Sequence, residues 1–498
     1  PELFRNGVRS IGWEKVEWAF AWFSAGRVAI VGGILVSRMV VVSNRVPDPG
    51  RPPQGGLAVA VQAALKERGG VWMGWSGRSS GSKEPGPLTI REEGAITYAL
   101  SDLSDQDLSE YYAGLANSVL WPLCHYRIDL TDYARRDMAG YLRVNRLFAE
   151  RLRPLIRADD VIWIHDYHLL PLAAELRQMG VANRIGFFMH IPWPSPDVFF
   201  TLPVQAALLT AMTAFDLIGF QTEDDAENFA LCLRRGGVAN PVEGAAGLFE
   251  NPMRRFRVGA FPIGIDVGAF SGCVPSNGTS STIKRFQQSL EGRDLIVGVD
   301  RLDYTKGIPE RLRGFRRFLE VNPAWHGRIT MLQITPKSRS DVAEYDALQH
   351  EVAEIAGHIN GAMGRLDWTP VRYVNRAFGQ QLLSAIYRMA KVGLVTPLRD
   401  GMNLVAKEYV AAQDPEDPGV LVLSRFAGAA HELGEGALLV NPYDVETIAD
   451  ALARAASMPL EQRLQRYQAM MSAVTTNDVF HWCRHYLDQL SGLRQDPQ

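Results

Sequence analysis

The chain has 498 residues, of which 47% are hydrophobic and 21% charged, the balance of a globular protein with roughly two to four domains. Its net charge of −3 excludes general electrostatic attraction to nucleic acid or to an anionic membrane. Local Arg and Lys residues must therefore hold any anionic substrate. The four cysteines form no CxxC pair, which argues against a disulfide framework or a zinc site and favours the reducing cytoplasm.

Residues 1–35 form a segment that differs from the rest of the chain. The apolar stretch at 19–36 is interrupted by Arg27 and by several glycines, whereas a membrane helix needs about 20 predominantly apolar residues. Glu14 and Glu17 precede the stretch, where a signal peptide would be cationic. We interpret 1–35 as a leader of uncertain status and not as a membrane anchor.

Residues 36–266 alternate between short apolar runs and helical patterns, which is typical of a parallel sheet covered by helices. Strands are expected at Met39–Ser43, Val161–His165, Ile185–His190 and Asp216–Gln221, and helices at Leu57–Lys66, Leu172–Met179 and Asp224–Leu233. The first predicted helix begins at the pair Gly55 and Gly56, where the backbone can closely approach a ligand. The sequence contains neither GxGxxG nor GxxxxGK[ST], so dinucleotide oxidoreductases and P-loop hydrolases are not favoured.

Two predicted strands of this half end in histidine-rich segments. The residues concerned are His165, Asp166, His168 and His190. Such a set is compatible with a metal site, or with hydrogen bonds to hydroxyl groups at a ligand-binding wall. The sequence does not fix which side chains point the same way. We favour the second interpretation and predict no metal.

Residues 267–475 repeat the alternating pattern and predict a second domain of the same type. Strands are expected at Leu295–Val299, Ile329–Ile334, Val371–Val374, Val392–Val395, Val420–Leu423 and Leu438–Val440, and helices at Pro309–Leu319, Gln380–Met389, Asn403–Gln413 and Val445–Ala456. Ser271–Ser281 is predicted as a surface loop. The predicted fold is α/β, with two Rossmann-like, doubly wound domains facing across a cleft, and residues 476–498 carry a helix that could pack back on the first domain.

Ligands of doubly wound sheets bind beyond the carboxyl ends of the strands, and two polar segments lie at such places. Arg301 and Lys306 share one strand-to-helix loop, which would bring two cations to one diphosphate. The alternative is that they pair with Asp300 or Asp303 on the surface.

The second polar segment runs from Arg399 to Glu408. It contains Asp400 on a turn and then a helix start near Asn403. Backbone N–H groups at a helix start suit a diphosphate, and Asp400 could accept hydrogen bonds from sugar hydroxyls. The alternative is that Asp400 only caps the helix and that Glu408 lies on a solvated face.

Several motifs in a fixed order resemble the trehalose-phosphate synthases, from about Ser37 to about Asp488. They include VVVSNR, GGLAV, GWSG, LWP, HYR, GYLRVN, IWIHDYHLLP, RLDYTKG and LRDGMNLVAKEYVAAQDP. The resemblance implies two Rossmann-like domains of the GT-B type. It also implies a retaining transfer of glucose from UDP-glucose to glucose 6-phosphate, which yields trehalose 6-phosphate and UDP.

The resemblance also assigns roles to individual residues. It implies a donor-binding set of Gly55, Gly56, His190, Arg301, Lys306, Phe378, Asp400, Leu404, Val405, Ala406, Lys407 and Glu408. It implies an acceptor-binding set of Arg45, Tyr112, Trp121, Asp166 and Arg339. The residues expected to act in catalysis are Asp166, His190, Arg301, Lys306 and Asp400.

The resemblance supplies no carboxylate nucleophile for a double displacement, so the favoured hypothesis is front-face attack with retention. The cysteine spacing and the net charge favour a cytoplasmic enzyme without nucleic-acid or membrane partners, and no cofactor is expected. The resemblance implies assembly as a dimer or tetramer. Alternatives are a related transferase with another acceptor, such as glycerol 3-phosphate, or another nucleotide-glucose donor. A hydrolase and a non-catalytic sugar-phosphate sensor are further alternatives. The sequence shows no DxDxT phosphatase motif after an apolar strand.

Overall fold

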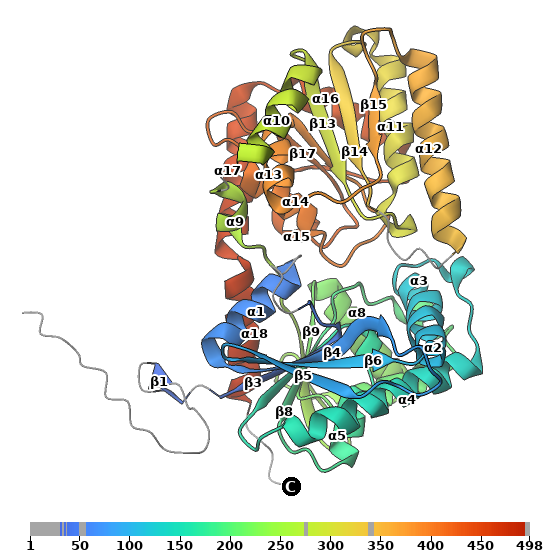
Figure 1. Ribbon diagram of the computed structural model, residues 1–498, viewed down its shortest axis with the longest axis vertical. Coiled ribbons are helices and arrows are strands. Elements are labelled where there is room, and N and C mark those ends of the chain that lie inside the picture. The colour runs from blue at the N-terminus through green and yellow to red at the C-terminus, as the bar shows by residue number, and fades with distance from the viewer. Residues whose placement is uncertain are drawn as a thin grey trace, which may run out of the picture.

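The computed structural model describes residues 30–31, 34–35, 37–48, 56–272, 277–336 and 343–493. Two α/β units lie one above the other in Figure 1, each built around its own sheet. Most of the predicted leader lies outside the described residues. Its described part is a pair of antiparallel strands, β1 (Ile30–Val31) and β2 (Ile34–Leu35).

The N-terminal unit contains a sheet with the strand order β10-β11-β12-β9-β8-β7-β3-β4-β6-β5. Every neighbouring pair from β12 to β6 is parallel. The chain order reverses between β3 and β7, which makes this the topological switch point of the sheet. The strands are β3 (Met39–Arg45), β4 (Gly70–Ser79), β5 (Leu88–Glu93), β6 (Ile96–Leu103), β7 (Val161–His165), β8 (Arg184–Phe188), β9 (Leu217–Phe220), β10 (Asn240–Pro241), β11 (Leu248–Glu250) and β12 (Arg255–Ala260).

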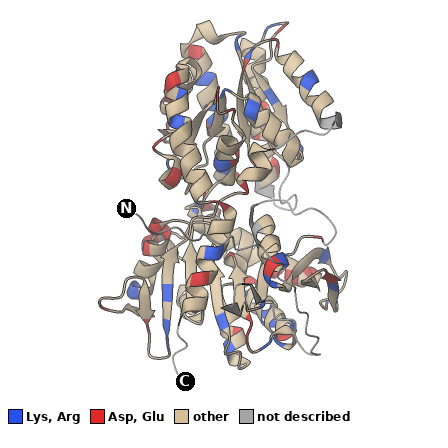
Figure 2. Cartoon of the chain, turned by 90° about the vertical axis from the view of Figure 1, so that its left-hand side faces the viewer, with Lys and Arg blue, Asp and Glu red and all other residues tan. Residues whose placement is uncertain are grey.

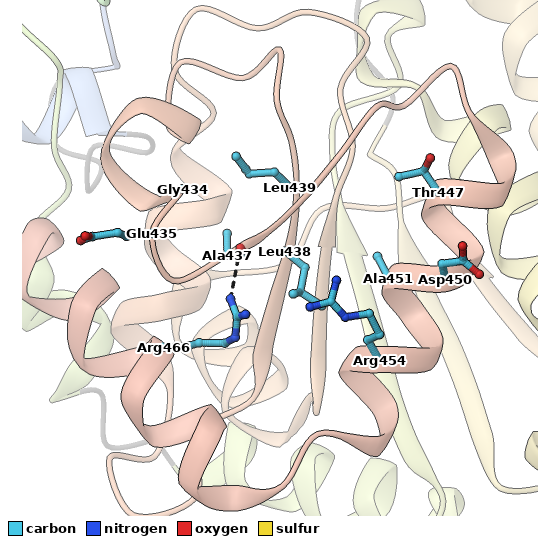
Figure 3. Close-up of a pocket in the computed structure, with 10 residues that line it drawn as sticks. All are labelled: Gly434, Glu435, Ala437, Leu438, Leu439, Thr447, Asp450, Ala451, Arg454 and Arg466. Carbon is cyan, nitrogen blue, oxygen red and sulfur yellow. Dashed lines mark hydrogen bonds between the residues drawn. The ribbon is translucent and has the colours of Figure 1, made fainter.

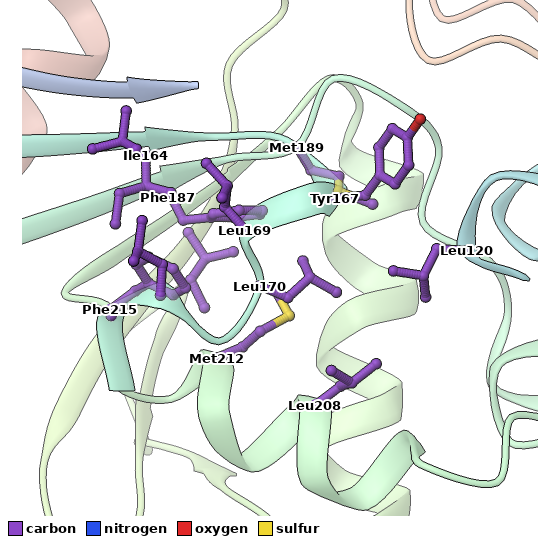
Figure 4. Close-up of a cluster of buried hydrophobic side chains, with 14 of the residues drawn as sticks. Leu120, Ile164, Tyr167, Leu169, Leu170, Phe187, Met189, Leu208, Met212 and Phe215 are labelled. Carbon is purple, nitrogen blue, oxygen red and sulfur yellow. The ribbon is translucent and has the colours of Figure 1, made fainter. Parts of the chain in front are cut away.

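Helices cover both faces of this sheet. They are α1 (Gly56–Arg68), α2 (Asp105–Asp107), η1 (Leu108–Leu120), α3 (Trp121–Cys124), η2 (Ile128–Leu130), α4 (Arg135–Leu152), η3 (Arg153–Leu155), η4 (Tyr167–Leu169), α5 (Leu172–Gln178), α6 (Pro196–Phe199), α7 (Gln205–Met212) and α8 (Glu223–Arg235). Figure 4 shows how the segment after β7 is held, because Leu169 and Leu170 lie in a buried apolar cluster with Leu208 and Met212 of α7.

Helix η1 is a π-helix of 13 residues, a conformation that is rare and often found at functional sites. It packs closely against α4. A Cβ at Gly140 of α4 would lie 2.3 Å from Cβ of Glu110, and one at Gly114 of η1 would lie 2.6 Å from Cγ of Asp137. The two glycines therefore set the short distance between the helices.

The C-terminal sheet is wholly parallel, with the order β15-β14-β13-β16-β17-β18. This is the doubly wound Rossmann order, and its switch point lies between β13 and β16. The strands are β13 (Asp294–Val299), β14 (Ile329–Ile334), β15 (Val371–Val374), β16 (Val392–Val395), β17 (Val420–Ser424) and β18 (Leu438–Val440). The helical elements are α9 (Val267–Ser271), α10 (Asn277–Leu290), η5 (Tyr304–Lys306), α11 (Ile308–Val321), η6 (Pro323–Trp325), α12 (Ala343–Met363), α13 (Gln380–Met389), α14 (Leu404–Ala412), α15 (Ala430–Leu433), α16 (Val445–Ser457) and α17 (Leu460–Thr476).

Helix α18 (Val479–Gly492) returns from the C-terminal unit to the first sheet, beside β8 and β9. Its Tyr486 ring occupies a notch that two glycines leave in these strands. A Cβ at Gly186 would lie 2.6 Å from the Tyr486 hydroxyl oxygen, and one at Gly219 would lie 2.7 Å from the ring. The hydroxyl lies 2.9 Å from the carbonyl oxygen of Phe187 and 3.1 Å from that of Leu217.

The prediction of two Rossmann-like units is confirmed. The prediction of a loop over Ser271–Ser281 is wrong at its end, because α10 begins at Asn277. Ile283, Phe286 and Leu290 recur at helical spacing behind that start, and the amphipathic pattern outweighs the local turn residues. Among the described residues no helix is long and apolar enough to cross a membrane. Acidic and basic residues alternate along the cartoon in Figure 2, where they are coloured red and blue.

Candidate functional site

The predicted site residues lie at the switch points of the two sheets. Arg45 ends β3 and Asp166 follows β7, which are the two strands that flank the N-terminal switch point. Arg301 follows β13 and Asp400 follows β16, which flank the C-terminal one. This is where ligands bind in open α/β sheets.

In the C-terminal unit, the two polar loops contact each other through charge. Lys306 Nζ forms an ion pair with Asp400 Oδ2, and Asn403 Nδ2 donates to the same oxygen at 3.0 Å. Arg301 is exposed. Asp300 forms its ion pair with Arg311, and Lys306 forms its ion pair with Asp400, which are not the pairs that the alternative for this loop assumed.

A buried cation, Arg311 of α11, lies beneath this loop. Its side chain is fully buried and forms an ion pair with Asp300 at 2.6 Å. It also donates to Thr396 Oγ1 at 3.0 Å, to Gln333 Oε1 at 3.2 Å and to the carbonyl oxygen of Lys306 at 3.4 Å. Arg311 thus connects the carboxyl ends of β13, β14 and β16 to the Lys306 loop.

The start of α14 differs from an ordinary capped helix. Its N-cap residue, Asn403, has φ 73° and makes no capping hydrogen bond. Asp400 accepts hydrogen bonds from Lys306 and Asn403, so the prediction that it might only cap the helix finds no support in these contacts. Of the donor-set residues on this helix, Leu404 and Val405 are half-buried and Ala406 is buried.

Further along α14, the side chains of Lys407 and Glu408 point to different surroundings. Lys407 is buried, forms an ion pair with Glu432 at 2.5 Å and donates to the carbonyl oxygen of Ile263 at 2.8 Å, so only its backbone is available to a ligand. Glu408 is half-buried, and Tyr387 donates to it at 3.5 Å. Burial raises the pKa of Glu408 to about 7, although the Tyr387 hydrogen bond opposes this.

Phe378 is half-buried and lies under the Arg376 guanidinium, whose central carbon is 5.0 Å from the ring centroid. It precedes α13, the helix that carries Tyr387. The ring thus lies on the segment that leads into the helix facing Glu408.

In the N-terminal unit, His190 follows β8 and contacts both His165 and Asp166. His165 Nδ1 lies 3.1 Å from His190 Nε2, and the backbone N–H of His190 donates to Asp166 Oδ1 at 3.2 Å. Burial lowers the pKa of His190 to about 3; burial, with the nearby His190, also holds the pKa of His165 well below its usual value. Both imidazoles are therefore neutral near pH 7. Asp166 has φ 79°, a strained conformation of the kind found at functional sites.

The predicted acceptor residues gather around aromatic rings. Arg45 lies over the Trp75 ring, with its guanidinium carbon 5.9 Å from the centroid. Tyr112 lies 5.3 Å from Trp75 and stacks on His168 at 6.0 Å. Trp121 is buried and packs against Tyr167 at 5.8 Å.

A glycine fixes the Arg45 side chain in this arrangement. A Cβ at Gly77 would lie 2.8 Å from Nε and Nη2 of Arg45, and Gly77 has φ 85°. Only glycine leaves room for the guanidinium at this place.

The two units meet next to the candidate site. A Cβ at Gly401 would lie 2.3 Å from the carbonyl oxygen of His190 and 3.0 Å from Cα of Ile191. The loop that carries Asp400 therefore rests directly on the backbone that carries His190, and a larger residue at 401 would separate them.

Two predicted site residues, Gly55 and Arg339, lie outside the described residues; Gly56 begins α1. No group of three His, Cys, Asp or Glu side chains in the described ranges is arranged to hold a metal ion. A separate pocket of about 510 Å³ lies at the β18 edge and contains none of the predicted residues. As Figure 3 shows, Arg454 and Arg466 line it, and Arg466 donates to a backbone carbonyl within it.

Sequence reasoning missed Arg311 and Gly77 as parts of the site. Gly77 belongs to the GWSG segment, which pointed to the family but gave this glycine no role. Arg311 lies on an otherwise apolar face of its helix. An Arg at such a position is the sequence signal that could have indicated a buried cation.

Several known proteins are similar to this chain in sequence and in fold. Glycosyltransferase family 20 matches residues 42–492. A trehalose-6-phosphate synthase of Sinorhizobium fredii is 59% identical over 92% of this chain and 98% of that protein.

Two solved structures are also similar. One, from E. coli and bound with UDP-2-fluoro glucose, has a TM-score of 0.87 at 47% identity, over 92% of this chain and 100% of that one. The other is an alpha,alpha-trehalose-phosphate synthase (UDP-forming) from Burkholderia xenovorans in complex with glucose-6-phosphate. It has a TM-score of 0.87 at 45% identity, over 92% of this chain and 100% of that one. By its sequence and its fold, the chain belongs to glycosyltransferase family 20.

Proposed function

We propose that this protein transfers glucose, with retention, from UDP-glucose to glucose 6-phosphate, which yields trehalose 6-phosphate and UDP. The observation that carries the proposal is the contact of the Lys306 and Asp400 loops with each other and with the His190 backbone. The substrates are those of the similar solved structures, which hold a UDP-glucose analogue and glucose 6-phosphate.

On the donor side, Arg301 and Lys306 bind the diphosphate, together with the backbone at Gly55, Gly56 and the start of α14. This role is supported by the exposure of Arg301 and by the uncapped N-terminus of α14, because two cations and free N–H groups suit a diphosphate.

The rest of the donor is held by side chains of both units. Asp400 and His190 bind the glucose, Glu408 binds the ribose and Phe378 lies at the base. Residues 404–407 line the nucleotide through their backbone. The neutral state of His190 supports its role as a hydrogen-bonding partner of hydroxyl groups.

On the acceptor side, Arg45 and Arg339 bind the phosphate, and Tyr112, Trp121 and Asp166 surround the sugar. The position of Arg45 over Trp75 supports this proposal, since the ring and Gly77 hold the guanidinium in one place.

The mechanism is a front-face displacement. The bond between the anomeric carbon and the diphosphate oxygen breaks, and the acceptor hydroxyl forms its bond on the same face. Its proton passes to the departing phosphate oxygen. Arg301 and Lys306 stabilise the charge that develops there, and Asp166, His190 and Asp400 orient the sugars. Loss of one such cation is expected to reduce kcat about 10²–10³-fold, so Arg301→Ala with a kcat within a few-fold of the parent would contradict the mechanism.

An acceptor screen tests the proposal. UDP-glucose is supplied with glucose 6-phosphate, with glycerol 3-phosphate or without acceptor, and UDP release is measured together with the NMR spectrum of the product. We expect release only with glucose 6-phosphate and an α,α-linked product.

Other outcomes point to the other functions. Free glucose without acceptor would indicate a hydrolase, turnover with glycerol 3-phosphate a related transferase, and tight binding without turnover a sensor. ADP-glucose and GDP-glucose in the same assay test the donor base.

We also propose the division into domains 36–266 and 267–475, with 476–498 returning to the first, and a homo-oligomeric, cytoplasmic enzyme. The division is supported by the separate sheets and by the contacts of α18 with β8 and β9. Size-exclusion chromatography with light scattering tests the assembly.

A further inference from the structure

The short segment between α3 and η2 contacts both polar loops of the C-terminal unit. The guanidinium carbon of Arg399 lies 3.9 Å from the ring centroid of Tyr126. The guanidinium carbon of Arg127 lies 5.5 Å from the ring centroid of Tyr304. Two adjacent residues of the first unit thus make cation–π contacts to two different loops of the second unit. In one contact the first unit supplies the aromatic ring, and in the other it supplies the cation.

The segment is held in an unusual conformation that makes both contacts at once. Tyr126 has φ 63°, which is uncommon and strained for an aromatic residue. Its hydroxyl accepts the backbone N–H of Ser195 at 2.8 Å. Arg127 is fixed by two hydrogen bonds to Asp129, at 2.9 and 2.7 Å. Both side chains are therefore oriented before any substrate binds.

The partners of these contacts flank the Lys306–Asp400 ion pair. Arg399 directly precedes Asp400, and Tyr304 shares η5 with Lys306. The same segment begins one helical turn after Trp121, and the His125 Nδ1 lies 2.7 Å from the carbonyl oxygen of Trp121. It therefore joins the acceptor side of the site to both donor loops.

We propose that Tyr126 and Arg127 are positioning residues for glucosyl transfer. They hold the two donor loops against the N-terminal unit through Arg399 and Tyr304, so that Lys306 and Asp400 are in place when the nucleotide sugar binds. We call these four residues the interdomain clamp. The inference rests on the proposed function for its kinetic consequence, whereas the clamp itself is a contact within the substrate-free protein.

The test compares two substitutions at one position. Tyr126→Leu removes the ring, whereas Tyr126→Phe keeps the ring and removes only the hydroxyl bond to Ser195. We expect Tyr126→Leu to raise the KM for UDP-glucose about 3–30-fold, the range that one cation–π contact supports, with a smaller effect on kcat. Tyr126→Phe should stay within about 3-fold of the parent.

A double-mutant cycle separates the clamp from general damage to the fold. Combined with Arg399→Gln, the Tyr126→Leu change should add little to the KM, because either substitution already breaks the contact. Additive effects, or equal effects of the Leu and Phe variants, would overturn the proposal.

Hydrogen exchange provides a readout that does not depend on activity. In the substrate-free protein, backbone amides of 301–307 and 399–403 should exchange faster in Tyr126→Leu than in Tyr126→Phe. Unchanged exchange would refute the clamp even if the enzyme is active. An inactive parent with the expected exchange difference would instead contradict the proposed function and leave the clamp intact.

Discussion

The carboxyl group of Glu408 should make both stability and nucleotide binding depend on pH. Its pKa is about 7 in the folded protein, against 4.5 for the ordinary group, because burial disfavours its charged form. The difference corresponds to about 3 kcal/mol, at about 1.4 kcal/mol per pKa unit. Since the pKa is raised on folding, the folded protein has this contribution to its stability in full below pH 4.5 and loses it as the pH rises through 7.

Glu408→Gln keeps the shape of the side chain and removes its charge. As the pH rises from 5.5 to 8, the free energy of unfolding of the variant should increase by about 2 kcal/mol relative to that of the parent. Urea unfolding curves at each pH, fitted with a common m-value, measure the difference. The exposed Glu354→Gln is the matched control and should show no such trend. A difference that stays constant over this range would refute the raised pKa.

The same variant tests the proposed ribose contact. Hydroxyl donors stabilise the charged carboxylate, so UDP binding should lower the pKa of Glu408 and release a proton below pH 7. Glu408→Gln should weaken UDP binding about 10–100-fold, the range for hydrogen bonds to a charged group. Calorimetry in buffers of different ionisation enthalpy measures both effects. Full UDP affinity in the variant would contradict the contact.

Three further predictions concern neighbouring residues. Arg311→Met leaves the buried carboxylate of Asp300 without its partner and should lower the free energy of unfolding by about 3–5 kcal/mol, with partial recovery in the double variant with Asp300→Asn; urea unfolding measures both. Gly401→Ala places a Cβ 2.3 Å from the His190 carbonyl oxygen, so kcat/KM should fall more than about 10-fold with little change in Tm, and parental kinetics would show that the close contact is not needed. The pKa of His190 is about 3 in the folded protein. Because this pKa is depressed, the imidazole of the unfolded chain binds a proton at a higher pH than that of the folded protein. Stability should fall by about 2 kcal/mol from pH 7 to pH 5, and His190→Gln should flatten this dependence in a pH series of urea unfolding curves.

The sequence predicted the strands and the polar loops that follow them well because their signals are local. Val161–His165 and Ile329–Ile334 are continuous apolar runs, and both were expected at the bounds that the structure has. Arg301 and Asp400 were found because polar residues at the carboxyl ends of buried strands stand out from their surroundings.

The remaining features depend on contacts between distant parts of the chain. The π-helical hydrogen bonding of Leu108–Leu120 leaves no periodic pattern that separates it from an ordinary apolar helix. The pairing of Arg311 with Asp300 and the fit of Gly77 beside Arg45 exist only after the sheets have formed. The start of α10 was missed because its first residues are those of a turn, while the apolar face lies further along.

The return of α18 to the first sheet has a consequence for the order of events during synthesis. The Tyr486 ring fills the notch at Gly186 and Gly219, and Trp482 packs at 5.0 Å on both Trp163 and Phe188. Phe187 of β8 and Leu217 of β9 leave the ribosome 299 and 269 residues before Tyr486 of the helix that covers them. The apolar face of the N-terminal sheet at β8 and β9 therefore lacks α18 while the whole second unit is translated. Its completion, and with it the joining of the two halves, can therefore follow only after the second unit has been translated.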